Sequence, residues 1–237
     1  MIRLVPQVSI VMAIKNASRF MREALDSIAA QSFQDYEVVV VDGGSEDDGV
    51  AIATSYPKVF CISQEGTGYA DAWNTGIAAG RGGFIAFLDS DDLWTPEKLE
   101  AQLKAFVDRP ECEYVFGRVK FFISPGETLP RGFRSNLLQD SYLIPTTGTA
   151  MIRRETLRRV GPLDTTLRIA ADIPWIAKIR ETSIVAHIDD VLLLKRLHSG
   201  NLGHTVSQNR FHSELLQVLQ QRAHEHRMAK LTSGNRS

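Results

Sequence analysis

Residues 83–96 read G-F-I-A-F-L-D-S-D-D-L-W-T-P and decide the fold. Within them, residues 84–88 are an unbroken apolar run, short enough for one strand that is buried on both faces of a sheet. Three carboxylates, Asp89, Asp91 and Asp92, follow this run directly. Because open α/β sheets bind their ligands beyond the carboxyl ends of the strands, these acids stand where a binding site is expected.

The chemistry of these acids has two interpretations. Asp89 and Asp91 offer hard oxygen ligands two residues apart, which suit Mg²⁺ or Mn²⁺ shared with phosphate oxygens. Alternatively, Asp91, Asp92 and Thr95 only shape a turn and cap a helix that opens at Pro96. Since Asp is common in turns and caps, this stretch by itself leaves both interpretations open.

Further strands are predicted upstream. The runs at residues 8–14, 36–41 and 59–63 are short, apolar and rich in β-branched residues. The second run ends at Asp42, and the glycines that follow allow the backbone to turn tightly against a ligand. Asp42 either starts this turn or shares a ligand site with Asp89, and its matching place at a strand end favours the shared site.

Helices are predicted between these strands. Met21, Leu25 and Ile28 recur at helical spacing behind Ser18, which we expect to be the N-cap. A capping box is expected at residues 45–48, opening a helix that runs to about residue 55, and another helix is expected over residues 71–79. The alternation of strand and helix predicts a single α/β domain.

The second half of the chain is less regular. We expect a helix from Pro96 to about residue 108, a strand over 114–122, and a loop over 123–145 that acts as a lid or binding segment. Later strands are expected at 149–152, 184–188 and 191–194, with helices at 154–160 and from Asp172 onward. We predict a domain of residues 1–204, followed by an amphipathic helix and polar tail over 205–237.

Composition excludes several classes. Lys and Arg number 27 and Asp and Glu 28, so the net charge of −1 predicts no nucleic-acid partner. Cys61 and Cys112 match no zinc or redox spacing, and the N-terminus matches neither a signal peptide nor a spanning helix. We therefore expect a cytoplasmic protein, with peripheral attachment at the inner face of the membrane and homo-oligomers left open. The P-loop is absent, and Asp71 replaces the third glycine of a dinucleotide fingerprint.

Four blocks of sequence resemble the GT-A glycosyltransferases of family 2. The first three are V-S-I-V-M-A-I-K-N, V-V-V-V-D-G-G-S, and D-A-W-N-T-G-I-A-A-G-R-G leading into F-I-A-F-L-D-S-D-D-L-W. The fourth is M-I-R-R-E-T-L-R-R-V-G-P-L-D, then A-D-I-P-W and K-R-L-H-S-G-N. Together they cover residues 8–201. The resemblance implies a Rossmann-like domain in which helices flank a mixed, mostly parallel central sheet.

The resemblance also implies an activity, the transfer of a sugar from a nucleotide diphosphate to an acceptor hydroxyl in polysaccharide or glycoconjugate biosynthesis. It implies a metal-dependent, inverting, hexosyl-type enzyme with a UDP-sugar as the favoured donor. The acceptor, whether a glycan, a lipid-linked group or another hydroxyl, stays open. A relative that binds a nucleotide sugar without transferring it is the alternative, and a nucleotidyltransferase is disfavoured because no glycine-rich loop ending in Arg or Lys follows the first strand.

Roles of single residues follow from the same resemblance. Asp172 would be the general base, and Asp91 would bind Mg²⁺ or Mn²⁺ with Asp89, the first acid of the D-x-D motif. His198 would ligate this metal or close over the diphosphate. Asp42 would accept a hydrogen bond from the base. The expected nucleotide-sugar contacts are Ala13, Ile14, Asn16, Asp42, Asp71, Asn74, Asp89 and Ser90.

The chain departs from the family pattern at three positions. Ala13 stands where proline is usual, and Trp73 stands where arginine often precedes the Asn-x-Gly. Ala171 stands where glutamate often precedes the base. The third departure bears most on acceptor binding, because it removes an acid beside Asp172.

Overall fold

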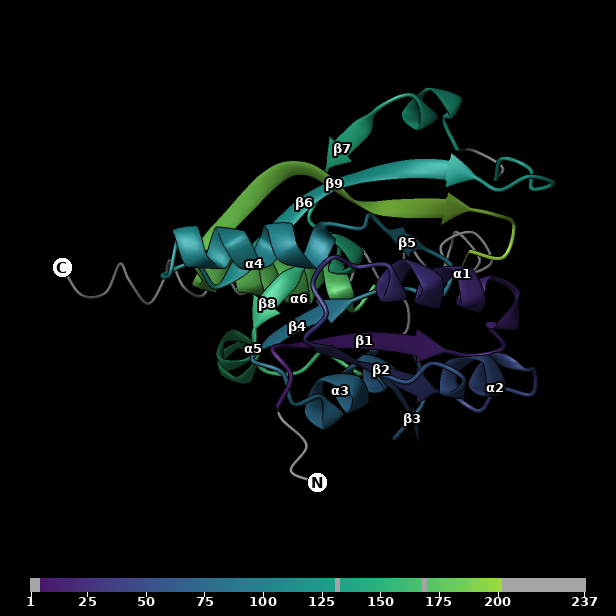
Figure 1. Ribbon diagram of the computed structural model, residues 1–237, viewed down its shortest axis with the longest axis horizontal. Coiled ribbons are helices and arrows are strands. Elements are labelled where there is room, and N and C mark those ends of the chain that lie inside the picture. Colours follow the sequence, from purple (N-terminus) through teal and green to yellow (C-terminus); the bar gives the residue numbers. More distant parts are fainter. Residues whose placement is uncertain (1–4, 131–132, 168–169, 202–237) are drawn as a thin grey trace.

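The computed structural model describes residues 5–130, 133–167 and 170–201 (Figure 1). Its strands form one sheet in the order β3-β2-β1-β4-β8-β6-β9-β5, with β7 paired to β6. The first four strands in this order are mutually parallel. They are β3 (Val59–Ser63), β2 (Tyr36–Asp42), β1 (Val8–Ile14) and β4 (Phe84–Phe87).

The other strands add antiparallel pairs and one long parallel ladder. The strand β8 (Met151–Arg153) runs antiparallel to both β4 and β6 (Tyr114–Ile123), and β6 pairs in parallel with β9 (Val185–Leu197). The short strand β5 (Leu93–Trp94) pairs antiparallel with β9 at one end of the order, and β7 (Ser141–Leu143) pairs antiparallel with β6. The predicted mixed, mostly parallel sheet of a Rossmann-like domain is confirmed.

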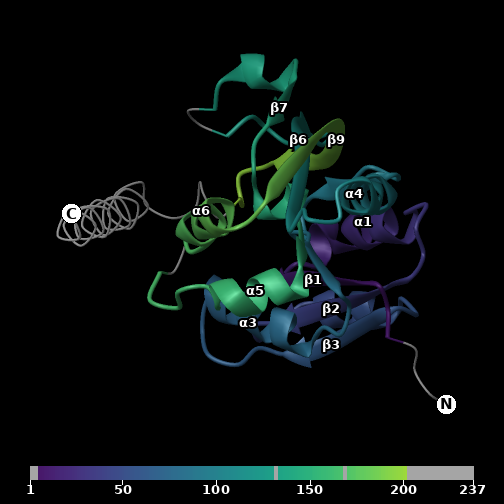
Figure 2. The same cartoon turned by 90° about the vertical axis from the view of Figure 1, so that its left-hand side faces the viewer.

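Helices cover both faces of this sheet (Figure 2). One face carries α1 (Ser18–Ala29), α2 (Gly49–Thr54) and α4 (Lys98–Asp108). The opposite face carries α3 (Tyr69–Ala79), α5 (Arg154–Val160) and α6 (Asp172–Thr182). The sheet is therefore the middle of three layers, and its central strands are buried on both sides, as their continuous apolar sequences predict.

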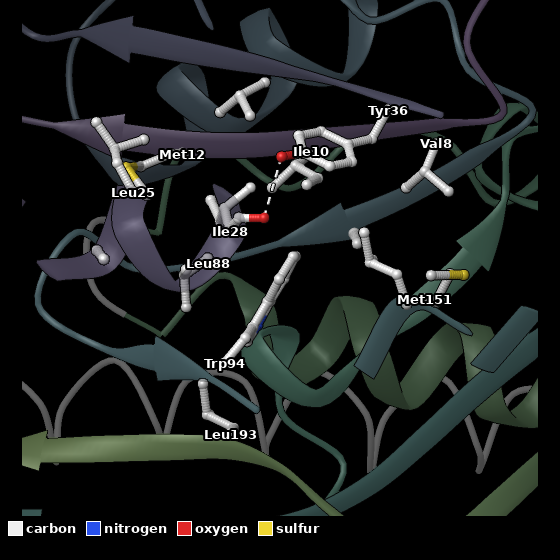
Figure 3. Packing of buried hydrophobic residues seen from close by; sticks show 14 of the residues in the cluster. Val8, Ile10, Met12, Leu25, Ile28, Tyr36, Leu88, Trp94, Met151 and Leu193 are labelled. Atoms are coloured by element: carbon white, nitrogen blue, oxygen red, sulfur yellow. Dashed lines mark hydrogen bonds between the residues drawn. The ribbon is translucent and has the colours of Figure 1, made fainter. Parts of the chain in front are cut away.

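The pleat divides each central strand between two cores. Val8, Ile10 and Met12 of β1 pack against α1, whereas Val11 packs against α3 on the other face. Figure 3 shows the α1 side, where the Tyr36 hydroxyl also donates a 3.0 Å hydrogen bond to the carbonyl of Ile28. This bond satisfies the one polar atom that Tyr36 brings into the core.

Several expected boundaries are wrong for identifiable reasons. Ser18 does not cap α1 with its side chain; instead its backbone N–H donates to Asp47 Oδ2 over 2.8 Å. The capping box at residues 45–48 is absent, because the backbone N–H of Ser45 donates to the carboxylate of Asp42. The first turn of α1 is capped by a residue from another segment, and the spacing of residues within the helix cannot reveal such a partner.

The region after Asp92 also differs from expectation. The chain forms β5 against β9 before α4 begins at Lys98, so Pro96 does not open the helix. The two late strands expected within 184–194 are one strand, β9, which continues to Leu197. Residues 123–145, expected to be a loop, contain β7 and the short helix η1 (Ser135–Leu138).

Two expectations on the ends of the chain remain. The amphipathic helix and tail predicted over 205–237 lie outside the described residues. Across the part of the chain that the structure describes, none of the helices has the length and apolarity needed to cross a bilayer.

We predict that Gly76→Ala destabilises the protein by about 1–3 kcal/mol, the usual cost of overpacking a core. A Cβ at Gly76 in α3 would lie 2.3 Å from Cγ1 of Val11 and 3.1 Å from Cγ2 of Val41. This clash outweighs the gain of roughly 1 kcal/mol that alanine brings to a helix. Urea unfolding measures the difference. Gly83→Ala is the control, because its Cβ would meet only the carbonyl oxygen of Gln7 at 3.9 Å, and equal stabilities of the two variants would contradict the prediction.

Candidate active site

The carboxyl ends of β1, β2 and β4 bring three polar segments to one edge of the sheet. Ile14, the last residue of β1, is in register with Asp42, the last residue of β2. β4 lies on the other side of β1, and Asp89 follows it after one buried leucine. The predicted convergence of strand-end acids on one edge is therefore observed.

The β1–β2 corner is held by hydrogen bonds between the two loops. The Asp42 carboxylate accepts the backbone N–H of Ser45, with oxygen distances of 3.0 and 3.3 Å. Asn16 has a φ of 52° and accepts the backbone N–H of Glu46 on its side-chain oxygen at 2.8 Å. Ile14 is buried and Ala13 half-buried beside this corner. The corner is thus held by hydrogen bonds within the chain, and Asp42 is half-buried in it.

The three acids after β4 form a tight group. Oxygen atoms of Asp89, Asp91 and Asp92 lie within 4.8 Å of one another. The backbone N–H of Asp92 donates to the carbonyl of Asp89 over 3.2 Å, which closes a turn and leaves Ser90 half-buried at its tip. Asp91 and Asp92 thus shape a turn, as the structural interpretation expected, but without capping α4. The turn interpretation and the metal-site interpretation of these acids are therefore compatible.

The end of β9 reaches these acids from the opposite half of the sheet. Lys195 Nζ lies 2.7 Å from Asp92 Oδ2 and 3.3 Å from Asp89 Oδ2. The backbone N–H of Arg196 donates to Asp92 Oδ1 over 2.9 Å. Burial lowers the pKa of the Lys195 ammonium, but the charges of the surrounding acids, Asp92 first, raise it by more. Lys195 is therefore a permanent cation within the acidic group.

Arg196 positions the backbone of the acidic turn. Its guanidinium is 1% exposed and lies 4.5 Å from the ring centre of Phe20 and 4.7 Å from that of Phe122. Its Nε donates to the carbonyl of Asp91 over 2.8 Å, and Nη2 pairs with Glu23 at the same distance. Because two aromatic faces and three acceptors, the third being the Ser124 hydroxyl on Nη1, hold this planar group, the carbonyl of Asp91 has little freedom.

The Asp91 side chain is held by the turn that follows β9. His198 Nε2 lies 2.9 Å from Asp91 Oδ2, and the Asn201 amide donates to the same oxygen over 3.0 Å. The N–H of Gly200 donates to His198 Nδ1 over 3.1 Å, so the ring proton belongs on Nε2, which donates to Asp91. Within the described residues, no group donates a hydrogen bond to the other oxygen of Asp91, Oδ1.

These oxygens fit a hard divalent cation. Asp91 Oδ1, which accepts no hydrogen bond from the described residues, and the partly exposed Asp89 carboxylate, whose Oδ2 lies 3.3 Å from Lys195 Nζ, are oxygen ligands of the type that Mg²⁺ and Mn²⁺ prefer. His198 lies beside them as the sequence predicted, although its Nε2 points to Asp91 here. Metal ligation by these residues stays a prediction.

Asp172 is the first residue of α6 and lies near the acidic group. Burial, and after it the nearby charge of Asp89, raise the pKa of Asp172 to about 6. Tyr69 lies near both acids: burial, and after it the charges of Asp89 and Asp172, raise the pKa of its hydroxyl, which therefore stays neutral. A carboxylate whose pKa lies near neutrality is suited to proton transfer.

Two of the residues that were expected to contact the nucleotide sugar lie on α3. Asp71 accepts the backbone N–H of Thr67 over 3.0 Å. The side-chain amide of Asn74 donates to and accepts from the backbone of Leu163, each over 2.9 Å. Both side chains therefore stabilise loops at the edge of the site, and their contacts with a donor stay predictions.

The remaining departures from the family pattern are buried. Trp73 is 1% exposed and stacks on Phe87 with ring centres 4.5 Å apart. Ala171 is fully buried in the core between the sheet and α6. A glutamate could not be accommodated there without rearrangement.

Sequence reasoning assigned no role to Lys195, Arg196 and Tyr69. The signal for the first two was present, since K-R-L-H-S-G-N interrupts a β-forming run with two adjacent charges, and such charges need buried partners when the strand continues. The tyrosine carried no local signal. Its nearness to Asp89 and Asp172 depends on segments that are far away in sequence.

Comparison with known proteins agrees with this geometry. The family model for glycosyl transferase family 2 matches residues 9–161. An uncharacterized glycosyltransferase of Nostoc sp. is 29% identical over 212 residues, which make up 82% of this chain and 66% of that protein. Two solved structures share the fold. S. aureus TarS in complex with UDP-GlcNAc has a TM-score of 0.70 at 21% identity, over 90% of this chain and 65% of the other.

The second structure is the mannosyltransferase PcManGT from Pyrobaculum calidifontis, in complex with GDP-Man and Mn²⁺. It has a TM-score of 0.65 at 23% identity, over 93% of this chain and 65% of the other. The chain thus spans just under two thirds of the length of these three relatives. From the family match, the strand-end acids and the shared fold, it follows that the chain belongs to glycosyl transferase family 2 and has the GT-A fold.

Proposed function

We propose that this chain transfers a sugar from a nucleotide diphosphate to an acceptor hydroxyl, with a divalent cation and with inversion at the anomeric carbon. One observation carries the proposal: Asp42, Asp89 and Asp91 follow strands that end at the same edge of the sheet, and Asp172 lies near enough to Asp89 for that charge to raise its pKa. Family membership and relatives that bind UDP-GlcNAc or GDP-Man support a nucleotide-sugar donor. We take a UDP-sugar as the first candidate.

The donor would lie across the carboxyl ends of β1, β2 and β4. Asp42 would accept a hydrogen bond from the base at the corner that Asn16 and Ile14 complete. Asp89, with Ser90, would face the ribose or sugar. Asp91 and Asp89 would hold the cation, with His198 as a further ligand or as a group that closes over the diphosphate. A divalent cation bound there would stabilise the negative charge that grows on the leaving diphosphate.

Asp172 would act as the general base. The acceptor hydroxyl oxygen forms a bond to the anomeric carbon as the bond from that carbon to the diphosphate oxygen breaks. The hydroxyl proton passes to the Asp172 carboxylate, and the electron pair of the broken bond leaves with the diphosphate. Attack by the acceptor from the face opposite the leaving diphosphate would invert the anomeric centre.

The alternative function is nucleotide-sugar binding without transfer. Ala171 favours it, because the acid that the family often places beside the base is replaced here by a buried methyl group. Against it stands Asp172 itself, whose raised pKa of about 6 suits a base. Turnover of the Asp172 variant described below separates the two functions.

We expect UDP-sugars to raise the melting temperature of the wild-type protein in the presence of Mn²⁺. A ligand at a hundredfold its Kd adds about 2.7 kcal/mol, which corresponds to roughly 5–10 °C for a chain of this size. Asp91→Asn should lose the Mn²⁺-dependent part of the shift, because the free carboxylate oxygen is replaced. An undiminished Mn²⁺-dependent shift in Asp91→Asn would rule out the metal assignment, and thermal unfolding across a panel of nucleotide sugars measures both results.

Asp172→Asn should lower kcat about 10²- to 10⁴-fold while the donor KM changes little, because only the proton acceptor is removed. Steady-state kinetics with the donor found in the screen measure the split. Asp108→Asn at the exposed end of α4 is the matched control and should keep full activity. Full turnover by Asp172→Asn would exclude Asp172 as the base. If the wild type itself shows no turnover, the binding function is favoured.

The pH profile should follow the ionisation of Asp172. Since burial and Asp89 raise its pKa to about 6, the carboxylate that accepts the proton predominates above this pH and is lost as the pH falls through it. We expect kcat to be level above about pH 7 and to fall tenfold per pH unit well below 6. Initial rates between pH 4.5 and 8.5 test this, with circular dichroism to verify folding; a rate that stays level down to pH 5 contradicts it.

A further inference from the structure

Asp92 is not available as a metal ligand, although its carboxylate is one of the three in the acidic group. The residue is fully buried, and both carboxylate oxygens already have strong partners. Lys195 Nζ lies 2.7 Å from Oδ2, and the backbone N–H of Arg196 donates to Oδ1 over 2.9 Å. A buried charge needs such partners to persist, and a cation could bind Asp92 only by displacing one of them.

Lys195 occupies the space between two of the acids. Its ammonium lies 3.3 Å from Asp89 Oδ2 as well as against Asp92, so it bridges both carboxylates. A compact ammonium with three donors can make both contacts at once, which a planar guanidinium would do less well. This position between paired carboxylates is one that a second divalent cation would otherwise take.

The Asp91 carboxylate has partners of a different kind. Asp91 Oδ2 meets His198 at 2.9 Å and the neutral amide of Asn201 at 3.0 Å, and no lysine or arginine side chain of the described residues pairs with its carboxylate. With all three acids ionised, the group and the Lys195 ammonium carry two net negative charges, which one divalent cation on the Asp91 side would neutralise.

We propose that Lys195 is the resident cation of this group: it holds Asp92 out of metal coordination and limits the three acids to a single divalent ion on the Asp91 side. Lys195 is in this sense a positioning residue. The inference rests on the metal site of the proposed function and adds to it a stoichiometry and a residue that sets it. Because the fixed charge of Lys195 opposes any second ion, its removal changes metal binding directly.

Titration with Mn²⁺, followed by the electron paramagnetic resonance signal of the free ion, tests the proposal on the full chain. The wild type should bind one Mn²⁺. Lys195→Met should bind Mn²⁺ on the order of tenfold more tightly or take up a second ion, since a neighbouring positive charge is removed. Lys120→Met, which removes an exposed lysine on β6, is the control and should bind as the wild type does.

Two further variants guard against misfolding and separate the roles of the acids. Asp92→Asn should still bind one Mn²⁺, because Asp92 is not a ligand. The double variant Lys195→Met with Asp92→Asn removes both charges of the buried pair, so it should fold, as circular dichroism can verify, and bind one Mn²⁺ within about threefold of the wild-type affinity. Asp91→Asn should bind none.

Each contrary result has its own meaning. Unchanged affinity and stoichiometry in Lys195→Met would overturn the role of Lys195 while the metal site stands. Loss of Mn²⁺ binding in a folded Asp92→Asn would make Asp92 a ligand and would also overturn it. Absence of binding in the wild type and Lys195→Met alike would instead overturn the metal assignment of the proposed function, and this inference with it.

Discussion

The pairing of the buried Asp92 carboxylate with the end of β9 is the interaction on which the site depends. Two donors from consecutive residues, the ammonium of Lys195 and the backbone N–H of Arg196, hold its two oxygens. The pair joins the parallel half of the sheet, which ends at β4, to the half built on β6 and β9. Once it is formed, the Arg196 guanidinium reaches the carbonyl of Asp91, and the turn after β9 presents His198 to its side chain. The geometry of the acidic edge therefore follows from one buried ion pair.

The three-layer core supplies the rigidity that this pair needs. Central strands bury alternate side chains against different helices, so a shift of one strand would disturb both cores. The parallel register then places the ends of β1 and β2 level with each other, and the Asp42 corner forms without further adjustment. A precise edge on a rigid sheet is the arrangement that preorganised electrostatic catalysis requires.

Local sequence predicted the parts of the fold that local forces decide. The continuous apolar strands, the acids at their ends and the helix that begins at Asp172 were all visible, because burial on both faces and turn chemistry leave clear patterns. The errors fall where the partner is distant in the chain. At the start of α1, the side chain of Asp47 supplies the acceptor that Ser18 was expected to supply. The strand β9 continues through Lys195 because Asp92 compensates the charge of this lysine. Charged residues inside a strand look like its end until their partner is known.

The chain separation within the buried pair has a consequence for biosynthesis. Asp92 and Lys195 lie 103 positions apart, so at ribosomal rates of about 5–20 residues per second roughly 5–20 s pass between the synthesis of the two. A nascent chain that ends soon after β4 carries Asp92 without Lys195, so burial of this carboxylate is unfavourable. This end of the sheet must then stay exposed to water. The ion pair can therefore form only after β9, the last strand in the described part of the chain, has been synthesised, which makes β9 the segment that completes the acidic edge.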